Sequence, residues 1–412
     1  MRELRLEARG QAQETKARLL IDSLFYHEES QSMLTALIAP AVFDGFERLG
    51  TSALLVENDT LVGLVSPSDI PSHYTTETLE GGLLAPGLLD LQANGGGGAL
   101  LNNDPSQTAL KTMAEGHARK GVARILATVI SDTREVTEQA VDAAVLASSD
   151  PHSGILGIHV EGPFFSNERN GVHQQDQLRK LEAADWQWLE RAASIPGIVT
   201  LAPEQVAVAD IQRMASLGLR VSAGHTNAVF DEVNAAISAG LSGFTHLFNA
   251  MRPQTGREPG VVGAALASDE TWCGVIADGI HVHPASLRLA LKAKPRGKVY
   301  LVSDAMATIG SVDKQFRLYG EWISEIDGRL VNSAGRLAGS AISLVDAVRY
   351  CCEHLQVPVD EAIAMASRYP AEYLGIDDRF GSLRPGRMAD LTWFDDGMNV
   401  KGLWRAGSRL AL

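Results

Sequence analysis

From Leu83 onward, short apolar runs alternate with amphipathic stretches of roughly 10–15 residues. This alternation is typical of βα units, because a parallel strand is buried on both faces and its crossover helix on one. The pattern predicts eight strands. They are Leu83–Leu91, Val122–Val129, Gly154–Val160, Gly197–Leu201, Leu219–Ala223, Gly243–Thr245, Cys273–Ala277 and Val299–Val302.

Helical patterns separate most of these runs, and two more follow the eighth. The predicted helices are Thr108–Lys120, Thr133–Leu146, Leu181–Ala193, Phe230–Ala239, Pro284–Leu291, Leu344–His354 and Val359–Ser367. Eight strands joined by helices favour an α/β fold of the (β/α)8 TIM-barrel type. A doubly wound open sheet is the alternative, but no G-x-G-x-x-G motif opens a first helix.

The two ends of the chain have a different hydrophobic pattern from this central part. Ala53–Val65 is predicted to form two short strands around an Asn-Asp turn, whereas residues 11–37 have loose helical spacing. We expect residues 1–82, with this helical extension, and residues 375–412 to build one small β-sandwich domain. Residues 83–374 are then the catalytic barrel.

The composition limits the classes of function. Hydrophobic residues make up 45% and charged residues 21% of the 412, as expected for a chain with a sizeable core. The formal net charge of −14 disfavours nucleic acid as a partner, because its phosphates would be repelled over most of the surface. The 3 cysteines are too few for a disulfide framework. No apolar run is long enough for a signal segment or a membrane span, so we expect a cytoplasmic protein.

Ionisable side chains follow five of the predicted strands. Glu161 ends the third strand, His225 and His246 follow the fifth and sixth, His281 the seventh, and Asp304 the eighth. In a barrel, catalytic groups lie at the C-terminal ends of the strands, because these ends and their loops form the open face. A single histidine at a strand end is more often structural, but five such ends are expected to converge at one opening.

Two imidazoles and one carboxylate form a three-ligand site that leaves a coordination position free for water. A divalent ion in such a site acidifies its water, and a neighbouring carboxylate can transfer the proton to a leaving group. Asp304 is placed for that role. The strand ends therefore predict metal-assisted hydrolysis.

Several short motifs carry a family resemblance. They lie in order across roughly residues 83–391: His159-Val-Glu-Gly-Pro-Phe164, Ser222-Ala-Gly-His-Thr226, Thr245-His-Leu-Phe-Asn-Ala-Met251, Thr255-Gly-Arg-Glu-Pro-Gly260, Ala277-Asp-Gly-Ile-His281, Leu301-Val-Ser-Asp-Ala305 and Leu337-Ala-Gly-Ser340. Together they make the chain similar to the amidohydrolase superfamily and, within it, to the N-acetylglucosamine-6-phosphate deacetylases. The resemblance implies hydrolysis of N-acetyl-D-glucosamine 6-phosphate to D-glucosamine 6-phosphate and acetate, in amino-sugar catabolism.

The resemblance also implies roles for single residues. Glu161, His225 and His246 would hold one divalent metal ion per subunit, expected to be Zn²⁺, and Asp304 would be the catalytic acid and base. His173 would help to polarise the acetamide carbonyl. The implied substrate contacts are Val172, His173, Asn249, Ala250, Arg257, His281, Leu337, Ala338 and Gly339, with the last three in a loop over the sugar.

Family members of this kind are commonly homodimers in which the arginine matched by Arg257 reaches into the neighbouring site. A guanidinium is a natural partner for a phosphate, and Arg257 would attract an anion to an acidic protein. The alternative is that Arg257 is only a solvated charge on a loop. We expect a small-molecule substrate, a homodimer, and neither a nucleic acid nor a membrane as partner.

The sequence departs from many amidohydrolases after the first strand. In place of His-x-His it reads Gln92-Ala-Asn94. Amides are weak metal ligands, so a single-metal site is favoured. Two other functions remain open: hydrolysis of another, cyclic amide, or sugar-phosphate binding by a non-catalytic regulator.

Overall fold

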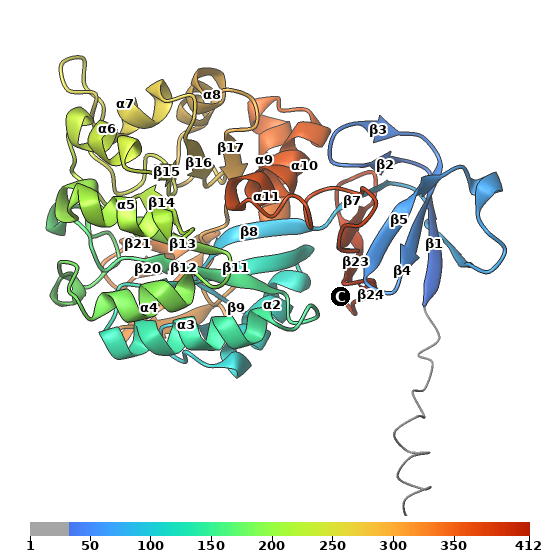
Figure 1. Ribbon diagram of the computed structural model, residues 1–412, viewed down its shortest axis with the longest axis horizontal. Helices are drawn as coiled ribbons and strands as arrows, with labels where there is room; N and C mark the ends of the chain where they lie inside the picture. Colours follow the sequence, from blue (N-terminus) through green and yellow to red (C-terminus); the bar gives the residue numbers. More distant parts are fainter. Residues whose placement is uncertain (1–32) are drawn as a thin grey trace, which may run out of the picture.

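The computed structural model describes residues 33–412. Within this range, eight parallel strands form a barrel sheet with helices around it (Figure 1). The barrel strands are β8 (Leu88–Ala93), β11 (Val122–Ile130), β12 (Ile155–Glu161), β13 (Gly197–Leu201), β14 (Arg220–Ala223), β15 (Leu241–Phe244), β16 (Trp272–Val275) and β17 (Val299–Leu301). Their order, β17-β16-β15-β14-β13-β12-β11-β8, follows the chain, so the predicted (β/α)8 fold is confirmed.

The first and last barrel strands meet through the segments that follow them. The backbone amide of Asp304 donates to the carbonyl of Gln92 over 2.9 Å, and that of Asn94 donates to the carbonyl of Ala305 over 2.9 Å. Ala93 and Ala305 form an isolated parallel bridge. We call residues 92–95 and 303–305 the seam of the barrel, because these backbone bonds close the ring at the C-terminal ends of the strands.

Helices cover the outside of the barrel (Figure 1). They are α2 (Gln107–Ala118), α3 (Arg134–Ser148), α4 (Asp185–Ala192), α5 (Val208–Ser216), α6 (Phe230–Ser238), α7 (Gly260–Ala267), α8 (Pro284–Ala293), α9 (Leu344–Leu355), α10 (Val359–Ala366) and α11 (Arg368–Leu374), with short 3-10 turns η1 (Pro67–Asp69), η2 (Asn167–Arg169), η3 (Gln175–Gln177) and η4 (Pro203–Gln205). Among the described residues, none of these helices is long and apolar enough to span a bilayer.

A smaller β unit combines segments from both ends of the described chain, coloured blue and red in Figure 1. Its strands are β1 (Leu34–Ala39), β2 (Val42–Phe43), β3 (Arg48–Leu49), β4 (Ser52–Glu57), β5 (Thr60–Val65), β6 (Thr75–Thr78), β7 (Leu83–Pro86), β22 (Leu391–Phe394), β23 (Val400–Arg405) and β24 (Ser408–Arg409). They form two sheets, β5-β4-β1-β6 and β24-β23-β22-β7-β2-β3. Leu54, Leu84 and Trp404 belong to one buried cluster that both sheets share.

One local expectation was wrong, and a second was wrong over the part of its range that the structure describes. The predicted strand Leu83–Leu91 is two strands, since β7 pairs with β22 in the small unit and only β8 enters the barrel. Pro86 and Gly87 lie between them, and both residue types interrupt a strand. Of the helical pattern at 11–37, residues 11–32 lie outside the described residues, and the rest enters β1.

An antiparallel sheet that the sequence reading did not anticipate follows β17. Its strands are β18 (Gln315–Leu318), β19 (Glu321–Ile326), β20 (Arg329–Asn332) and β21 (Leu337–Ser340). Phe316 and Leu330 pack in one buried cluster with Ile130, which ends β11. The sheet thereby covers the C-terminal face of the barrel, beside the short pair β9 (Gly95–Gly96) and β10 (Ala99–Leu100).

Candidate active site

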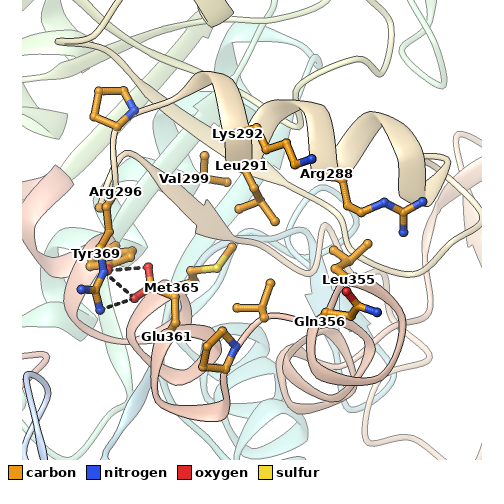
Figure 2. A pocket seen from close by; sticks show the side chains of 14 residues that line it. Arg288, Leu291, Lys292, Arg296, Val299, Leu355, Gln356, Glu361, Met365 and Tyr369 are labelled. Atoms are coloured by element: carbon orange, nitrogen blue, oxygen red, sulfur yellow. Dashed lines mark hydrogen bonds and ion pairs between the residues drawn. The ribbon is translucent and has the colours of Figure 1, made fainter.

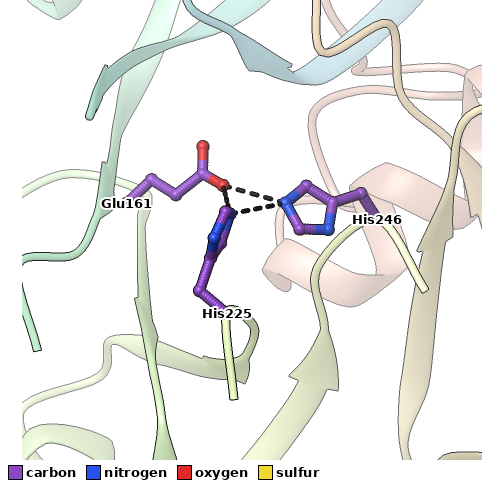
Figure 3. A group of neighbouring side chains, drawn as sticks. All are labelled: Glu161, His225 and His246. Atoms are coloured by element: carbon purple, nitrogen blue, oxygen red, sulfur yellow. Dashed lines mark hydrogen bonds and ion pairs between the residues drawn. The ribbon is translucent and has the colours of Figure 1, made fainter. Parts of the chain in front are cut away.

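Three buried side chains converge at the C-terminal end of the barrel, and Figure 3 shows their tips pointing toward one another. Glu161 ends β12, and His225 and His246 lie two residues beyond β14 and β15. The Oε1 atom of Glu161 is 3.2 Å from Nε2 of His225 and 3.0 Å from Nε2 of His246. The two imidazole nitrogens are 3.1 Å apart. Three donor atoms therefore form a nearly equilateral triangle.

The backbone at these positions adopts a conformation that the residue types do not favour. His225, His246 and Asp304 have φ angles of 48°, 32° and 53°. Residues other than glycine reach this left-handed region at a cost of about 1–3 kcal/mol each. Such strain persists where the surrounding fold fixes the chain, and here it turns three side chains toward one point.

A hydrogen bond fixes which nitrogen of His225 faces the cluster. Nδ1 of His225 lies 2.9 Å from the carbonyl oxygen of Arg169, so this nitrogen carries the proton and Nε2 presents its lone pair. Nδ1 of His246 is buried and has no partner among the described residues. The Nε2 lone pair of His225 faces the Oε1 atom of Glu161 at 3.2 Å, and two such acceptors repel one another unless a cation lies between them.

The donor triangle fits a divalent metal ion. A tetrahedral ion with bonds of about 2.0–2.1 Å holds its ligand atoms roughly 3.3 Å apart, close to the separations found here. Two imidazoles and a carboxylate form the donor set of catalytic zinc and similar ions. These three residues also form the group of His, Cys, Asp and Glu side chains in the described chain that could hold a metal. The geometry thus supports a site with three protein ligands.

The two carboxylates of the site differ in their protonation. Burial alone would raise the pKa of Glu161, but the close contacts with the imidazoles of His225 and His246 bring it well below its ordinary value. Burial among the surrounding groups, and then the charge of Glu161, raise the pKa of Asp304 to about 7. Because a general base works best with a pKa near the operating pH, Asp304 is suited to exchange protons in neutral solution.

Two amides that sequence reasoning considered only as poor metal ligands contact both carboxylates. Nδ2 of Asn94 donates to Oδ1 of Asp304 over 2.6 Å. Nε2 of Gln92 donates to the same oxygen over 3.1 Å and to Oε2 of Glu161 over 3.0 Å. We call Gln92 and Asn94 the amide pair. Their position after the first barrel strand was the signal that could have identified them.

His173 reaches the site from the loop after β12. Its Nδ1 accepts a hydrogen bond from the backbone amide of Ser131 over 3.1 Å, so the proton lies on Nε2. Burial, and then the neighbouring His225, hold the pKa of His173 well below its ordinary value. The ring is therefore neutral at pH 7 and presents an N–H donor.

These groups surround a cavity of about 180 Å³. Its lining is Asn94, Ile130, Glu161, Gly171, Val172, His173, His225, His246, Asn249, Ala250, His281, Asp304, Met306, Leu337 and Gly339. His281 donates from Nδ1 to Asp278 over 2.5 Å, and its buried Nε2 has no partner among the described residues. A polar ligand in the cavity would find that nitrogen available.

Most residues singled out from the sequence lie at this cavity, with two exceptions. Ala338 lines an adjoining cavity of about 490 Å³ instead. Arg257 is exposed in the loop before α7 and does not line the cavity. In addition, Leu337, Ala338 and Gly339 belong to strand β21, not to a loop.

A larger cavity, of about 410 Å³, lies elsewhere, between α8, α9, α10 and the start of β17 (Figure 2). It is lined by apolar side chains and by an ion pair in which Nη2 of Arg296 lies 2.6 Å from Oε2 of Glu361. None of the residues predicted for catalysis reaches it. The cavity at the strand ends is therefore identified as the site by the residues that line it and not by its volume.

Comparison with known proteins agrees with this geometry. Residues 83–410 match the model of the amidohydrolase family. The chain belongs to this family. Its N-acetylglucosamine-6-phosphate deacetylase relatives include one from Haemophilus influenzae, 31% identical over 90% of this chain and 100% of its own length. An N-acetylgalactosamine-6-phosphate deacetylase from a Shewanella species is 39% identical over 87% of this chain and 91% of its own.

Solved amidohydrolase structures extend the likeness to the fold. The crystal structure of N-acetylglucosamine-6-phosphate deacetylase from Pasteurella multocida has a TM-score of 0.88 and 34% identity, covering 92% of this chain and 100% of its own. The resemblance drawn from the motifs is thus confirmed. The amidohydrolase family is metal-dependent, and the Glu161, His225 and His246 group can hold a metal here.

Proposed function

We propose that this chain hydrolyses the acetamide of N-acetyl-D-glucosamine 6-phosphate to D-glucosamine 6-phosphate and acetate, in amino-sugar catabolism. The observation that carries the proposal is Asp304, with its pKa near 7, beside the donor triangle of Glu161, His225 and His246. A protein that only bound sugar phosphates would have no need for an acid and base at that place. The deacetylase relatives support the substrate class.

The residues divide the reaction among them. Asp304 removes a proton from the attacking water, whose oxygen adds to the carbonyl carbon of the acetamide. The Nε2–H of His173 donates to the oxygen on which negative charge develops. Asp304 then delivers its proton to the departing amine as the carbon–nitrogen bond breaks, which leaves acetate and a free amino sugar.

The proposed cofactor is one divalent ion per subunit, and we take it to be Zn²⁺. When bound by Glu161, His225 and His246, such an ion supplies Lewis acidity that acidifies water and polarises a carbonyl. Gln92 and Asn94 offer neutral amides where a second ion would need imidazoles, and both amides already donate to carboxylates. This supports one ion in place of two.

We further propose a homodimer in which Arg257 contacts the phosphate in the neighbouring subunit. No lysine or arginine of residues 33–412 lines the cavity, although a dianionic phosphate has to be bound there. Arg257 is exposed and is not hydrogen-bonded to any other described residue, so it is free to reach a partner. We place this dimer in the cytoplasm, which suits free Cys273, Cys351 and Cys352.

A second candidate substrate is N-acetyl-D-galactosamine 6-phosphate, the C4 epimer, because the relative at 39% identity carries that name. The deciding experiment measures acetate release from both epimers on one purified sample, with bound metal counted. We expect kcat/KM to favour the glucosamine derivative and about one metal per chain. Preference for the galactosamine derivative would transfer the proposal to that epimer, and release from neither would direct attention to cyclic amides.

The role of Arg257 is tested with mixed dimers. Asp304→Asn and Arg257→Ala subunits should each be poorly active alone, the second through a raised KM for the phosphorylated substrate. If Arg257 acts across the dimer, mixing them restores about half of the wild-type activity per hybrid, because one site then combines an intact Asp304 with an intact arginine. Absence of restoration in verified hybrids would mean that Arg257 acts within its own subunit or not at all.

A further inference from the structure

The amide pair contacts both functional carboxylates. Gln92 and Asn94 are each only 1% exposed. The single amino group of Gln92 contacts Oε2 of Glu161 at 3.0 Å and Oδ1 of Asp304 at 3.1 Å, and thereby bridges a metal-site ligand and the base. Asn94 adds a second donor, at 2.6 Å, to that oxygen of Asp304. Gln92 lies in the first barrel strand and Asn94 directly follows it, whereas Glu161 ends the third strand and Asp304 follows the eighth.

These contacts distinguish the two oxygens of each carboxylate. On Glu161, Oε2 is held by Gln92, and Oε1 is left to face the two imidazoles. On Asp304, Oδ1 accepts from both amides, and Oδ2 accepts no hydrogen bond from the described residues. One oxygen of each group is therefore held, and the other is available for the chemistry.

We propose that Gln92 and Asn94 are positioning residues that orient Glu161 and Asp304 together. The inference rests on the proposed deacetylase function and adds two residues to it. Neutral donors suit this task, because a cation at the same place would form an ion pair with the base and compete with the proton that it must take. An amide fixes the rotamer of a carboxylate without adding a charge.

The backbone of the seam supports this role. The amide of Asp304 donates to the carbonyl of Gln92, so the base and its positioning residue are joined by main chain as well as by side chain. Asp304 also has a φ of 53°, an unfavourable conformation that the surrounding fold has to hold in place. Gln92 and Asp304 are therefore joined by two hydrogen bonds, one through the main chain and one through the side chains.

The two amides make different contacts, and this difference provides the test. Asn94→Leu removes a donor to Asp304 only. We expect kcat to fall about 10- to 100-fold with KM within about twofold, and the metal dissociation constant to stay unchanged. Gln92→Leu also releases Glu161. For it we expect a similar fall in kcat together with metal binding weakened about 10-fold or more.

Metal affinity is measured by competition with a chromophoric chelator on metal-free protein, and folding by thermal melts followed by circular dichroism. Asn102→Leu is the matched control, because Asn102 is a buried amide that bonds the Ile130 carbonyl and Asp132 instead. It should lower stability while kcat and metal affinity stay within about threefold. Should either leucine variant fail to fold, Gln92→Met and Asn94→Ser replace them with the same expectations.

The outcomes separate this inference from the proposed function. Unchanged kcat in both variants, or equal metal affinity in both, would overturn the positioning role. If the wild-type protein releases acetate from neither sugar phosphate, the deacetylase proposal fails. The metal measurement still decides the inference in that case, because the affinities of the Gln92 and Asn94 variants must differ whatever the substrate is.

Discussion

Two clusters of buried carboxylates in this protein differ in the partners that surround them. Asp185, in the first turn of α4, is fully buried, and both of its oxygens are bonded to Arg179 at 2.6 Å, with Arg134 at 3.1 Å. Glu161 and Asp304 lie at the strand ends, and no lysine or arginine in residues 33–412 bonds either of them.

The pKa values of the carboxylates express this difference. Although burial opposes it, hydrogen bonds, led by that from Arg179, lower the pKa of Asp185 to about 2. At the strand ends, burial and the charge of Glu161 raise the pKa of Asp304 to about 7. In the Asp185 cluster, the arginines of the chain neutralise the carboxylate. At the strand ends no cationic side chain neutralises the carboxylates, and a metal ion can supply the positive charge.

The backbones differ in the same sense. Asp185 begins a regular helix, whereas His225, His246 and Asp304 all have positive φ. The strand ends thus combine unpaired negative charge with unfavourable backbone, whereas Asp185 has neither. The contrast suggests that changes at the strand ends affect rate and metal binding, and that changes at Asp185 affect stability.

The largest effect is expected for Asp304→Asn. Loss of the only proposed proton acceptor should lower kcat by about 10³- to 10⁴-fold, while metal and substrate binding persist. Acetate release and metal content of the purified variant provide the measurement. Near-normal turnover would remove Asp304 from the proposed mechanism.

The next largest effect is expected when the metal is removed. A ligand bound at about 1,000 times its dissociation constant stabilises the folded state by about 4 kcal/mol, so a strong chelator should lower the melting temperature by several degrees. Glu161→Gln should melt at the same temperature with and without chelator, because its triangle has lost the anionic donor. A chelator effect of wild-type size in this variant would argue against the triangle as the metal site.

Asp185→Asn should destabilise the fold by about 3 kcal/mol, because two arginines lose a buried anionic partner. The kcat of the folded variant should equal that of wild type. Urea denaturation at pH 7 measures the first quantity and acetate release the second. A loss of kcat without a loss of stability would contradict the division between the clusters.

The stability provided by Asp185 should also depend on pH. Its folded-state pKa, about 2, lies below the ordinary value of 3.8, so its contribution is complete above roughly pH 4 and is lost as the pH falls toward 2. The difference in unfolding free energy between wild type and Asp185→Asn should therefore narrow from pH 5 to pH 2.5. A difference that stays constant over this range would show that the stabilisation is not ionic.

The smallest effect is expected at an exposed pair. Arg191 and Asp142 lie 2.7 Å apart, but their side chains are 39% and 56% exposed. Water and salt screen such a pair, so Asp142→Asn should change the unfolding free energy by less than about 0.5 kcal/mol. A larger change in urea denaturation would mean that burial does not separate strong from weak ion pairs in this fold.

The sequence pattern predicted the barrel well because continuous apolar runs leave a clear signal in the chain. It failed where that signal was interrupted or polar. Leu83–Leu91 was merged across Pro86 and Gly87, and the sheet from Gln315 to Ser340 was missed although Asp327-Gly328 is a strong hairpin turn.

For the site, residue types at strand ends were sufficient to select Glu161, His225, His246 and Asp304. The positive φ of the last three could not be predicted, because it is imposed by the closed barrel on residues that resist it locally. The hydrogen bonds that Gln92 and Asn94 donate to the carboxylates could not be predicted either. A hydrogen bond between residues 212 positions apart depends on the complete fold.

The closure of the barrel at its seam has a consequence for the order of events during folding. Gln92 and Asn94 are synthesised early, and the carboxylate of Asp304, more than 200 residues later, receives their hydrogen bonds only when the two ends of the barrel meet. Joining such distant segments costs loop entropy that local contacts cannot offset in advance. A partly folded barrel can therefore contain most of its helices and strands and still lack the hydrogen bonds that hold the carboxylate of Asp304.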